Sequence, residues 1–283
     1  MRRTLTAVVL LLAGVLPAVA VASWWAYGEA TDTERFLETA RPLSTDATVQ
    51  RAVADELVAA ANAELGSLPV PVPGGTTALR AQVRSIAERL VASSAYRESF
   101  LAVLRTTHAR LVARLEGDVD ARLTMDLGRI ATVLRARVRA AGLPAEVADA
   151  IRDPAPVVLA DRAEMRRTRD ATDRIRIVRA FSIPGAIVAL LLVALTAPGL
   201  ASGVLRVAAC LAVSTLLLVA AWLVARAVIA ADSSSRDLAL AVYDVLTRPL
   251  RGWVIGGTVG AVALAAVGGG LRVAHGARVD RRP

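Results

Sequence analysis

Four long apolar stretches divide the chain. They run over Leu5–Trp25, Ile183–Leu200, Val207–Ala231 and Trp253–Leu271. Each is close to the ~20 residues that a helix needs to cross a hydrocarbon core of ~30 Å. Between the first and second stretches, apolar residues recur every three or four positions, as they do on one face of a surface helix. The pattern predicts a mostly α protein, with a transmembrane bundle of four spans and a helical domain of residues 28–180.

The first stretch, residues 1–27, has two interpretations. A basic start, an apolar run and small residues near Ala18–Ala22 are typical of a secretory signal peptide. The uncharged run, however, is longer than the ~7–15 residues of a signal's apolar region. Trp24, Trp25 and Tyr27 follow it as interfacial anchors do. We favour a retained transmembrane helix, and a cleaved signal peptide is the alternative.

The helical period defines the elements expected in residues 28–180. Asp32 and Asp46 precede apolar-periodic runs and are expected to cap two helices, the first ending near Pro42. The proline- and glycine-rich stretch 66–77 is expected to be a loop. Further helices are expected over residues 78–92, 95–116 and 127–141, and from residue 161 into the second span.

Two short stretches in this domain do not have a helical period. Residues 121–127 alternate polar and apolar side chains, and residues 155–160 are a short β-branched run. They are expected either to pair as a small two-stranded element or to be extended linkers, since runs of this length are ambiguous.

An amphipathic segment, residues 232–252, separates the third and fourth spans. Asp232 or a following serine can cap a helix there, and Pro249 is expected to end it. Its apolar face, which includes Leu238 and Val242, would meet either lipid or the helical domain. We favour docking on the helical domain, because few arginines flank that face.

Composition and charge support a membrane protein. The chain has 283 residues, of which 55% are hydrophobic, and all 34 basic residues are arginine. The net charge of +9 is not spread evenly, because residues 28–180 hold 23 arginines against 21 acids. Positive charge concentrated outside that domain is not a nucleic-acid surface, so no nucleic-acid partner is expected.

The excess arginines predict the sidedness of the membrane. Arg2 and Arg3 precede the first span, and Arg206 lies in the expected turn between the second and third. Arg272 and Arg278 belong to a basic tail, residues 272–283. Short loops rich in arginine face the cytoplasm. The prediction is a multi-pass plasma membrane protein, in which the stretch 253–271 is the last span and residues 28–180 are extracytoplasmic.

We expect no catalytic, cofactor-binding or metal-binding residues in this sequence. Cys210 is the only cysteine, and the two histidines, His108 and His275, lack neighbours at metal-ligand spacing. His108 is expected to be a partly buried polar residue of a helix. The acids of residues 116–126 do not match a calcium-binding loop, which requires glycine at its sixth position. No enzyme activity and no cofactor are expected.

Three residues within the spans have specific expectations. Arg226 is expected to extend to the interface as an anchor from the third span. Gly256 and Gly260 form a Gly-x-x-x-Gly motif, which allows close helix contact. That contact would be with the second or third span, or with another copy in a homo-oligomer. We favour the contact within one chain.

Part of the chain resembles a known group. The stretches "DTERFLETARPLSTDATVQRAVADEL", "SSAYRESFLAVLRTTHARLVARLEG", "LTMDLGRIATVLRARVRAAGL" and "AVYDVLTRPLRGW" occur in this order. In that order they resemble uncharacterised actinobacterial integral membrane proteins with four spans and an N-terminal extracytoplasmic helical domain. The resemblance implies the same topology and a short strand pair, and it implies no activity.

The function expected from these features is binding. A lone enzyme would need a cluster of reactive side chains, and a transporter would need polar span faces or broken helices. We expect an envelope-associated binding or scaffold protein that acts through residues 28–180, with a component of a transport or channel assembly as the alternative. Its expected partners are the lipid bilayer, a membrane or envelope protein, and a second copy of the chain.

Overall fold

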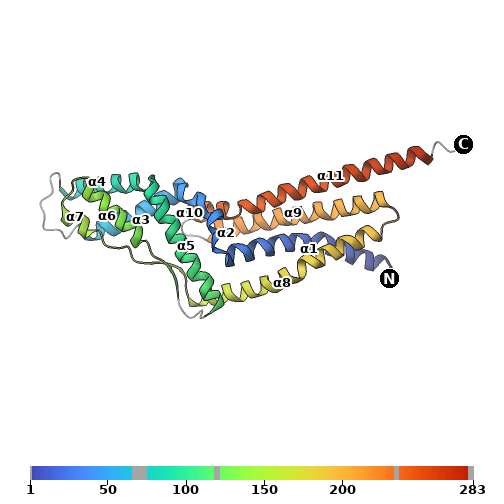
Figure 1. The fold of residues 1–283 in the computed structure, drawn as a ribbon, viewed down its shortest axis with the longest axis horizontal. Coiled ribbons are helices and arrows are strands. Elements are labelled where there is room, and N and C mark those ends of the chain that lie inside the picture. The colour runs from blue at the N-terminus through green and yellow to red at the C-terminus, as the bar shows by residue number, and fades with distance from the viewer. Residues whose placement is uncertain (1, 66–74, 118–121, 233–235, 280–283) are drawn as a thin grey trace. The chain divides into compact units, whose positions relative to one another are not determined.

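The computed structural model describes residues 2–65, 75–117, 122–232 and 236–279 (Figure 1). These residues are mostly helical, with one two-stranded sheet. The elements are α1 (Arg2–Thr31), α2 (Thr33–Ala40), the 3-10 helix η1 (Arg41–Thr45), α3 (Ala47–Leu65), α4 (Gly75–Val91), α5 (Ser94–Glu116), β1 (Leu123–Met125), α6 (Gly128–Ala140), α7 (Ala145–Ala150), β2 (Val157–Ala160), α8 (Arg162–Leu195), α9 (Leu200–Asp232), α10 (Arg236–Leu246) and α11 (Arg248–Val279). The prediction of a mostly α protein with a small strand pair is confirmed.

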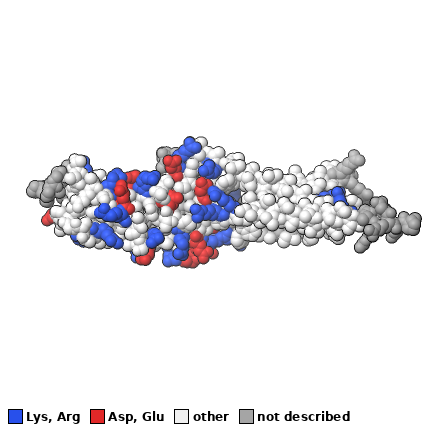
Figure 2. All heavy atoms as spheres, turned by 90° about the horizontal axis from the view of Figure 1, so that it is seen from above, with Lys and Arg blue, Asp and Glu red and all other residues white. Residues whose placement is uncertain are grey.

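The chain divides into two compact units. The span unit comprises Met1–Gly28, Ala171–Ala231 and Thr247–Pro283, and the charged unit comprises Glu29–Asp170 and Asp232–Leu246. Figure 2 shows the contrast in surface chemistry, since arginines and acids crowd the charged unit and are sparse on the span unit.

The span unit contains the apolar lengths of α1, α8, α9 and α11. These four helices are long and apolar enough to cross a membrane, as the sequence predicts. Ala13 of α1 is fully buried and packs with Val193 of α8 and Cys210 of α9. A Cβ atom on Gly257 of α11 would lie 2.9 Å from the hydroxyl oxygen of Thr215 on α9. α1 also contacts α11 through Trp24 and Trp253, and the four helices run along one another in Figure 1.

The connection between α8 and α9 differs from the prediction. α8 ends at Leu195 and α9 begins at Leu200, so the second span does not reach Leu200 and the third does not begin at Val207. Arg206 is therefore a half-buried residue of α9 and not part of the turn. The break falls at Pro198 and Gly199, because proline and glycine are the strongest local breakers of a helix.

The ends of α1 and α11 also differ from the predicted boundaries. α1 continues past Trp25 to Thr31, so no break separates residues 27 and 28. Pro249 does not end the amphipathic helix, because α10 stops at Leu246 and α11 starts at Arg248. Proline has no backbone N–H, and the first turn of a helix needs none there. Pro249 therefore opens α11.

Side-chain capping explains where the first helices of the charged unit begin. Asp32 Oδ1 accepts hydrogen bonds from the backbone N–H groups of Glu34 and Arg35, each at 3.1 Å. Asp46 Oδ1 accepts from the N–H of Thr48 at 2.9 Å, at the start of α3. Each carboxylate satisfies donors that the helix leaves unpaired. Both predicted caps are confirmed.

The charged unit is built around one hydrophobic core. Its fully buried large side chains lie at the helical spacing seen in the sequence, and they include Leu57, Leu79, Leu90, Tyr96, Ile130 and Leu134. The predicted helices are confirmed within one to three residues at the described ends. The predicted loop 66–77 is wrong at its end, because α4 starts at Gly75; residues 66–74 lie outside the described part.

The sheet and one short helix complete this unit. β1 and β2 run antiparallel, with Leu123 opposite Ala160 and Met125 opposite Val157. The pairing alternative is therefore the correct one. The six-residue α7 was not expected, because it is too short to show a period, yet its Val147 is fully buried.

α10 joins the core of the charged unit from a distant part of the sequence. Val245 is 4% exposed inside this core, and Leu238, Val242 and Leu246 pack against it. The apolar face of residues 232–252 thus docks on the helical domain, as favoured from the sequence. The predicted caps at Asp232 and the serines cannot be compared, since residues 233–235 lie outside the described part.

Candidate functional site

A groove in the span unit is lined by residues of three helices. Its volume is about 620 Å³, which lies within the ~300–1,000 Å³ typical of ligand sites. It is lined by Pro17, Ala18 and Val21 of α1, Leu211, Ser214, Thr215 and Leu218 of α9, and Pro249, Gly252, Trp253, Gly256, Gly257 and Gly260 of α11. We call it the glycine groove.

The glycines of α11 fall into two classes. Gly257 and Gly268 face α9, where an added Cβ atom would lie 2.9 Å from Thr215 and 2.7 Å from Leu205. Gly256 and Gly260 have no described atom within 4 Å of an added Cβ. The favoured contact of the Gly256–Gly260 motif with another span of the same chain is not seen among the described residues. Those two glycines open the groove instead.

One polar side chain on the groove floor is unusual. Ser214 is 5% exposed, and its hydroxyl has no hydrogen-bond partner among the described residues. The neighbouring Thr215 behaves as helix threonines commonly do, since its hydroxyl donates to the carbonyl oxygen of Leu211 at 2.9 Å. The Ser214 oxygen itself is not fully enclosed by protein, so it can be reached from the groove.

Aromatic residues and arginines gather at one end of this unit. Trp24 and Trp253 meet edge to face, with ring centroids 5.7 Å apart. The Arg179 guanidinium lies 4.6 Å from the centroid of the Tyr27 ring. Aromatic rings beside arginines are typical of the membrane–water interface. The anchor role of these aromatic residues stays a prediction.

The start of α11 belongs to the same end. Trp222 of α9 donates from its indole nitrogen to the Thr247 hydroxyl at 3.1 Å, and the Arg251 guanidinium lies 5.1 Å from the Trp222 ring centroid. Arg226 lies one helical turn beyond Trp222 and is half-buried. The indole nitrogen of Trp25, another predicted anchor, is buried without a hydrogen-bond partner in the described part of the chain.

The arginines used to predict topology lie at the other ends of these helices. Arg206 is near the start of α9, and Arg272 is in the last turns of α11. Arg2, Arg3 and Arg278 are helical, but their side chains lie outside the described part.

His108 is a buried polar residue of the charged unit with contacts to both ring nitrogens. It is 4% exposed, and its ring stacks on Phe36 with centroids 4.2 Å apart. Its Nδ1 lies 3.1 Å from the Thr33 hydroxyl and its Nε2 lies 2.9 Å from the carbonyl oxygen of Glu29. Burial lowers the pKa of His108, against a smaller opposing effect of the hydrogen bond to Glu29. This satisfied, buried histidine matches the expectation for a structural residue.

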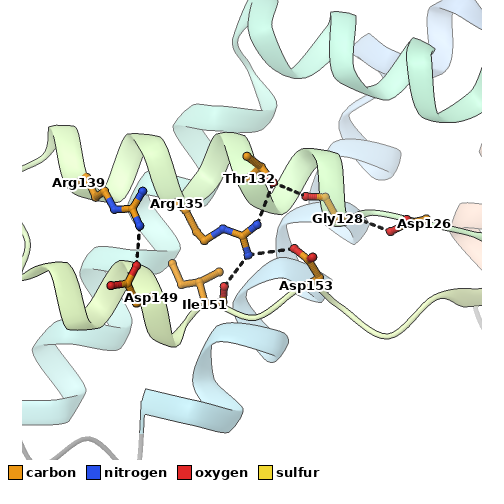
Figure 3. Close-up of polar contacts among 8 residues, drawn as sticks. All are labelled: Asp126, Gly128, Thr132, Arg135, Arg139, Asp149, Ile151 and Asp153. Atoms are coloured by element: carbon orange, nitrogen blue, oxygen red, sulfur yellow. Dashed lines mark hydrogen bonds and ion pairs between the residues drawn. The ribbon is translucent and has the colours of Figure 1, made fainter.

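A polar clamp holds α6 to the segment that follows it (Figure 3). Arg135 donates to the carbonyl oxygen of Ile151 at 2.9 Å, to Asp153 at 2.9 Å and to the Thr132 hydroxyl at 2.9 Å. Arg139 pairs with Asp149 on α7 at 2.5 Å. These contacts tie α6 to residues 149–153.

No group of three or more possible metal ligands occurs among residues 2–65, 75–117, 122–232 and 236–279. The acidic stretch 116–126 is only partly described, since residues 118–121 lie outside. Asp126 accepts a hydrogen bond from the Gly128 N–H at 2.8 Å, which is a local turn contact. The side chain of His275 is also outside the description.

Two features of the structure, the glycine groove and the contact between His108 and Glu29, were not expected from the sequence. The glycine groove combines residues of three helices that lie far apart in the sequence, and only the Gly-x-x-x-Gly spacing signals it. His108 and Glu29 are separated by 79 residues, so their contact has no local signature.

The fold defines an α-helical membrane protein with one helical unit of mixed charge. Comparison with family models, curated proteins and solved structures finds no match. Function must therefore be argued from the geometry alone.

Proposed function

We propose that the protein is a membrane-anchored binding or scaffold protein of the cell envelope, and that the charged unit is the part that meets its partner. The observation that supports this most is that two distant segments of the chain form this unit. Its single core combines Glu29–Asp170, which follows α1, with α10, which follows α9.

In a chain with four spans, the connections after the first and the third lie on the same side of the membrane. A single core made from both connections fits this topology. We place the charged unit outside the cytoplasm, because Arg206 and Arg272 lie toward the opposite ends of their helices and arginine marks the cytoplasmic side.

The surface of the charged unit suits a protein partner better than a nucleic acid. Arginines and acids alternate over it in Figure 2. Many of these charges form exposed ion pairs, for example Arg84 with Asp55 at 2.8 Å. Mixed charge of this kind favours complementary recognition by another protein.

Sidedness is tested with single cysteines. In a Cys210→Ala background, Ser94→Cys, at the exposed first residue of α5, should react with an impermeant maleimide in intact cells. Ala277→Cys in the C-terminal segment should react only after lysis. The reverse pattern would overturn the proposed side.

Binding is tested with a photoreactive amino acid in intact cells. Placed at exposed Arg97 of the charged unit, it should give a discrete crosslinked protein; placed at exposed Val273 of α11, it should not. Crosslinks only to further copies of the chain would instead favour a self-assembled channel component.

A further inference from the structure

The glycine groove costs stability unless something occupies it. Glycine inside a helix is about 1 kcal/mol less favourable than alanine. Three glycines, Gly252, Gly256 and Gly260, stand four residues apart on one face of α11, and none has a described atom within 4 Å of an added Cβ. Their space serves no contact within the described chain, so it is available to a ligand.

The dimensions fit a hydrocarbon chain. The groove follows α11 from Pro249 to Gly260, which is roughly 16 Å at the rise of an α-helix. Its walls are apolar side chains and glycine backbone, apart from the hydroxyls of Ser214 and Thr215. A chain in the groove would cover the unpaired Ser214 hydroxyl, and a lipid oxygen or a water below the headgroup would supply the acceptor it lacks.

One end of the groove is cationic. Arg248 stands four residues before Gly252 and therefore on the same face of α11. It is exposed, and it forms no ion pair within the described part of the chain. The only acid among the described residues of the span unit is Asp173, which pairs with Arg176 at 3.1 Å. This end therefore attracts an anion.

We propose that the glycine groove binds one acyl chain of an anionic phospholipid, with the lipid phosphate held at Arg248. The apolar length accounts for the chain and the arginine for the phosphate. Arg251, one turn away, adds positive charge from its position over Trp222. Arginine suits this role, because its guanidinium is always charged and can bind a phosphate with two parallel hydrogen bonds.

The same charge argues against a second copy of the chain as the occupant. Copies in one membrane share an orientation, so contact between their Gly252–Gly260 faces would bring two Arg248 side chains together. Like charges at an interface are unfavourable. An anionic lipid instead neutralises this charge.

The test measures lipid binding by native mass spectrometry of the full chain, delipidated in mild detergent. Dioleoylphosphatidylglycerol is the anionic probe, and dioleoylphosphatidylcholine is the zwitterionic one. One anionic lipid should bind per chain. Gly256→Leu should weaken this binding at least about tenfold, because the leucine side chain fills the groove. Gly270→Leu is the matched control, since Gly270 also has open space on α11 but does not line the groove.

A second variant keeps the proposal testable if Gly256→Leu does not fold. Arg248→Gln should weaken phosphatidylglycerol binding about fivefold, as expected for one surface arginine, and leave phosphatidylcholine binding unchanged. Equal binding of the two lipids, or unchanged binding by Gly256→Leu, would overturn the proposal. A dimer that Gly256→Leu dissociates without loss of lipid would show that a second copy occupies the groove.

Discussion

The Nε2 atom of His108 lies 2.9 Å from the backbone carbonyl oxygen of Glu29, in the last turn of α1. The last carbonyl groups of a helix lack partners within it. A proton on Nε2 lets His108 donate to this carbonyl, and Nδ1 then accepts from the Thr33 hydroxyl. One side chain of α5 thereby fixes the end of α1 and the beginning of α2.

Stability should depend on the protonation of His108. Burial lowers its pKa in the folded state, so the unfolded chain takes up the proton more readily. Stability should therefore fall as the pH drops through the unfolded value of about 6.5 and level off below the folded pKa. The measurement is the thermal unfolding midpoint of the detergent-solubilised chain between about pH 8 and 5. His108→Gln should flatten this profile, and parallel profiles would show that other groups are responsible.

The clamp of Figure 3 predicts unequal roles for two arginines of α6. Arg135→Gln should cost about 1–3 kcal/mol, because its side chain is only 23% exposed and holds Ile151 and Asp153. Arg139→Gln should cost about 0–1 kcal/mol, since it and Asp149 are both more than half exposed. Chemical unfolding of both variants gives the comparison. Equal losses of stability in the two variants would contradict the larger role given to Arg135.

Docking of α10 should depend on its buried valine. Val245→Asp places a carboxylate in the core of the charged unit and should cost at least about 2 kcal/mol. Hydrogen exchange in α10 should accelerate, and exchange in α3 should rise with it. The control is Asp237→Asn on the exposed side of α10, which should leave exchange unchanged. Slow exchange of α10 in the Val245→Asp chain would disprove the docking.

The contact between α9 and α11 should depend on Gly257. Gly257→Ile would force atoms against Thr215, where even a Cβ is 2.9 Å from the hydroxyl. Overpacking of this kind typically costs about 1–3 kcal/mol, and the thermal midpoint in detergent should fall. Gly269→Ile is the control on the same helix, because its added Cβ meets open space. A similar fall in both variants would point to a general effect of isoleucine.

Much of the fold follows from local pattern. Asp32 and Asp46 cap helices because their carboxylates reach N–H groups two or three residues on, and such contacts are readable in sequence. The strand pair and the docking of α10 were each one of two alternatives. Pattern alone could not choose for the strand pair, because short runs are ambiguous, whereas the few arginines beside the apolar face of α10 favoured its docking.

The features that could not be predicted from the sequence depend on contacts or breaks that involve other segments of the chain. Arg206 was placed in a turn because charge usually marks the end of a span, whereas Pro198 and Gly199 set the break earlier. The Gly-x-x-x-Gly motif of Gly256 and Gly260 is visible in the sequence. That α9 faces the neighbouring Gly257, and not these two glycines, is visible only in three dimensions. The lining of the groove by α1 and α9 has no sequence signal.

The place of α10 in the chain imposes an order on biogenesis. When the ribosome has finished α7, the charged unit still lacks Val245, and its core cannot close until α8 and α9 have been synthesised and inserted. If α9 were inserted incorrectly, α10 would be left on the wrong side of the membrane and an apolar surface of the charged unit would stay uncovered. A charged unit whose core includes α10 thus indicates that α9 was inserted correctly. A unit without α10 exposes the hydrophobic surface that chaperones and proteases recognise.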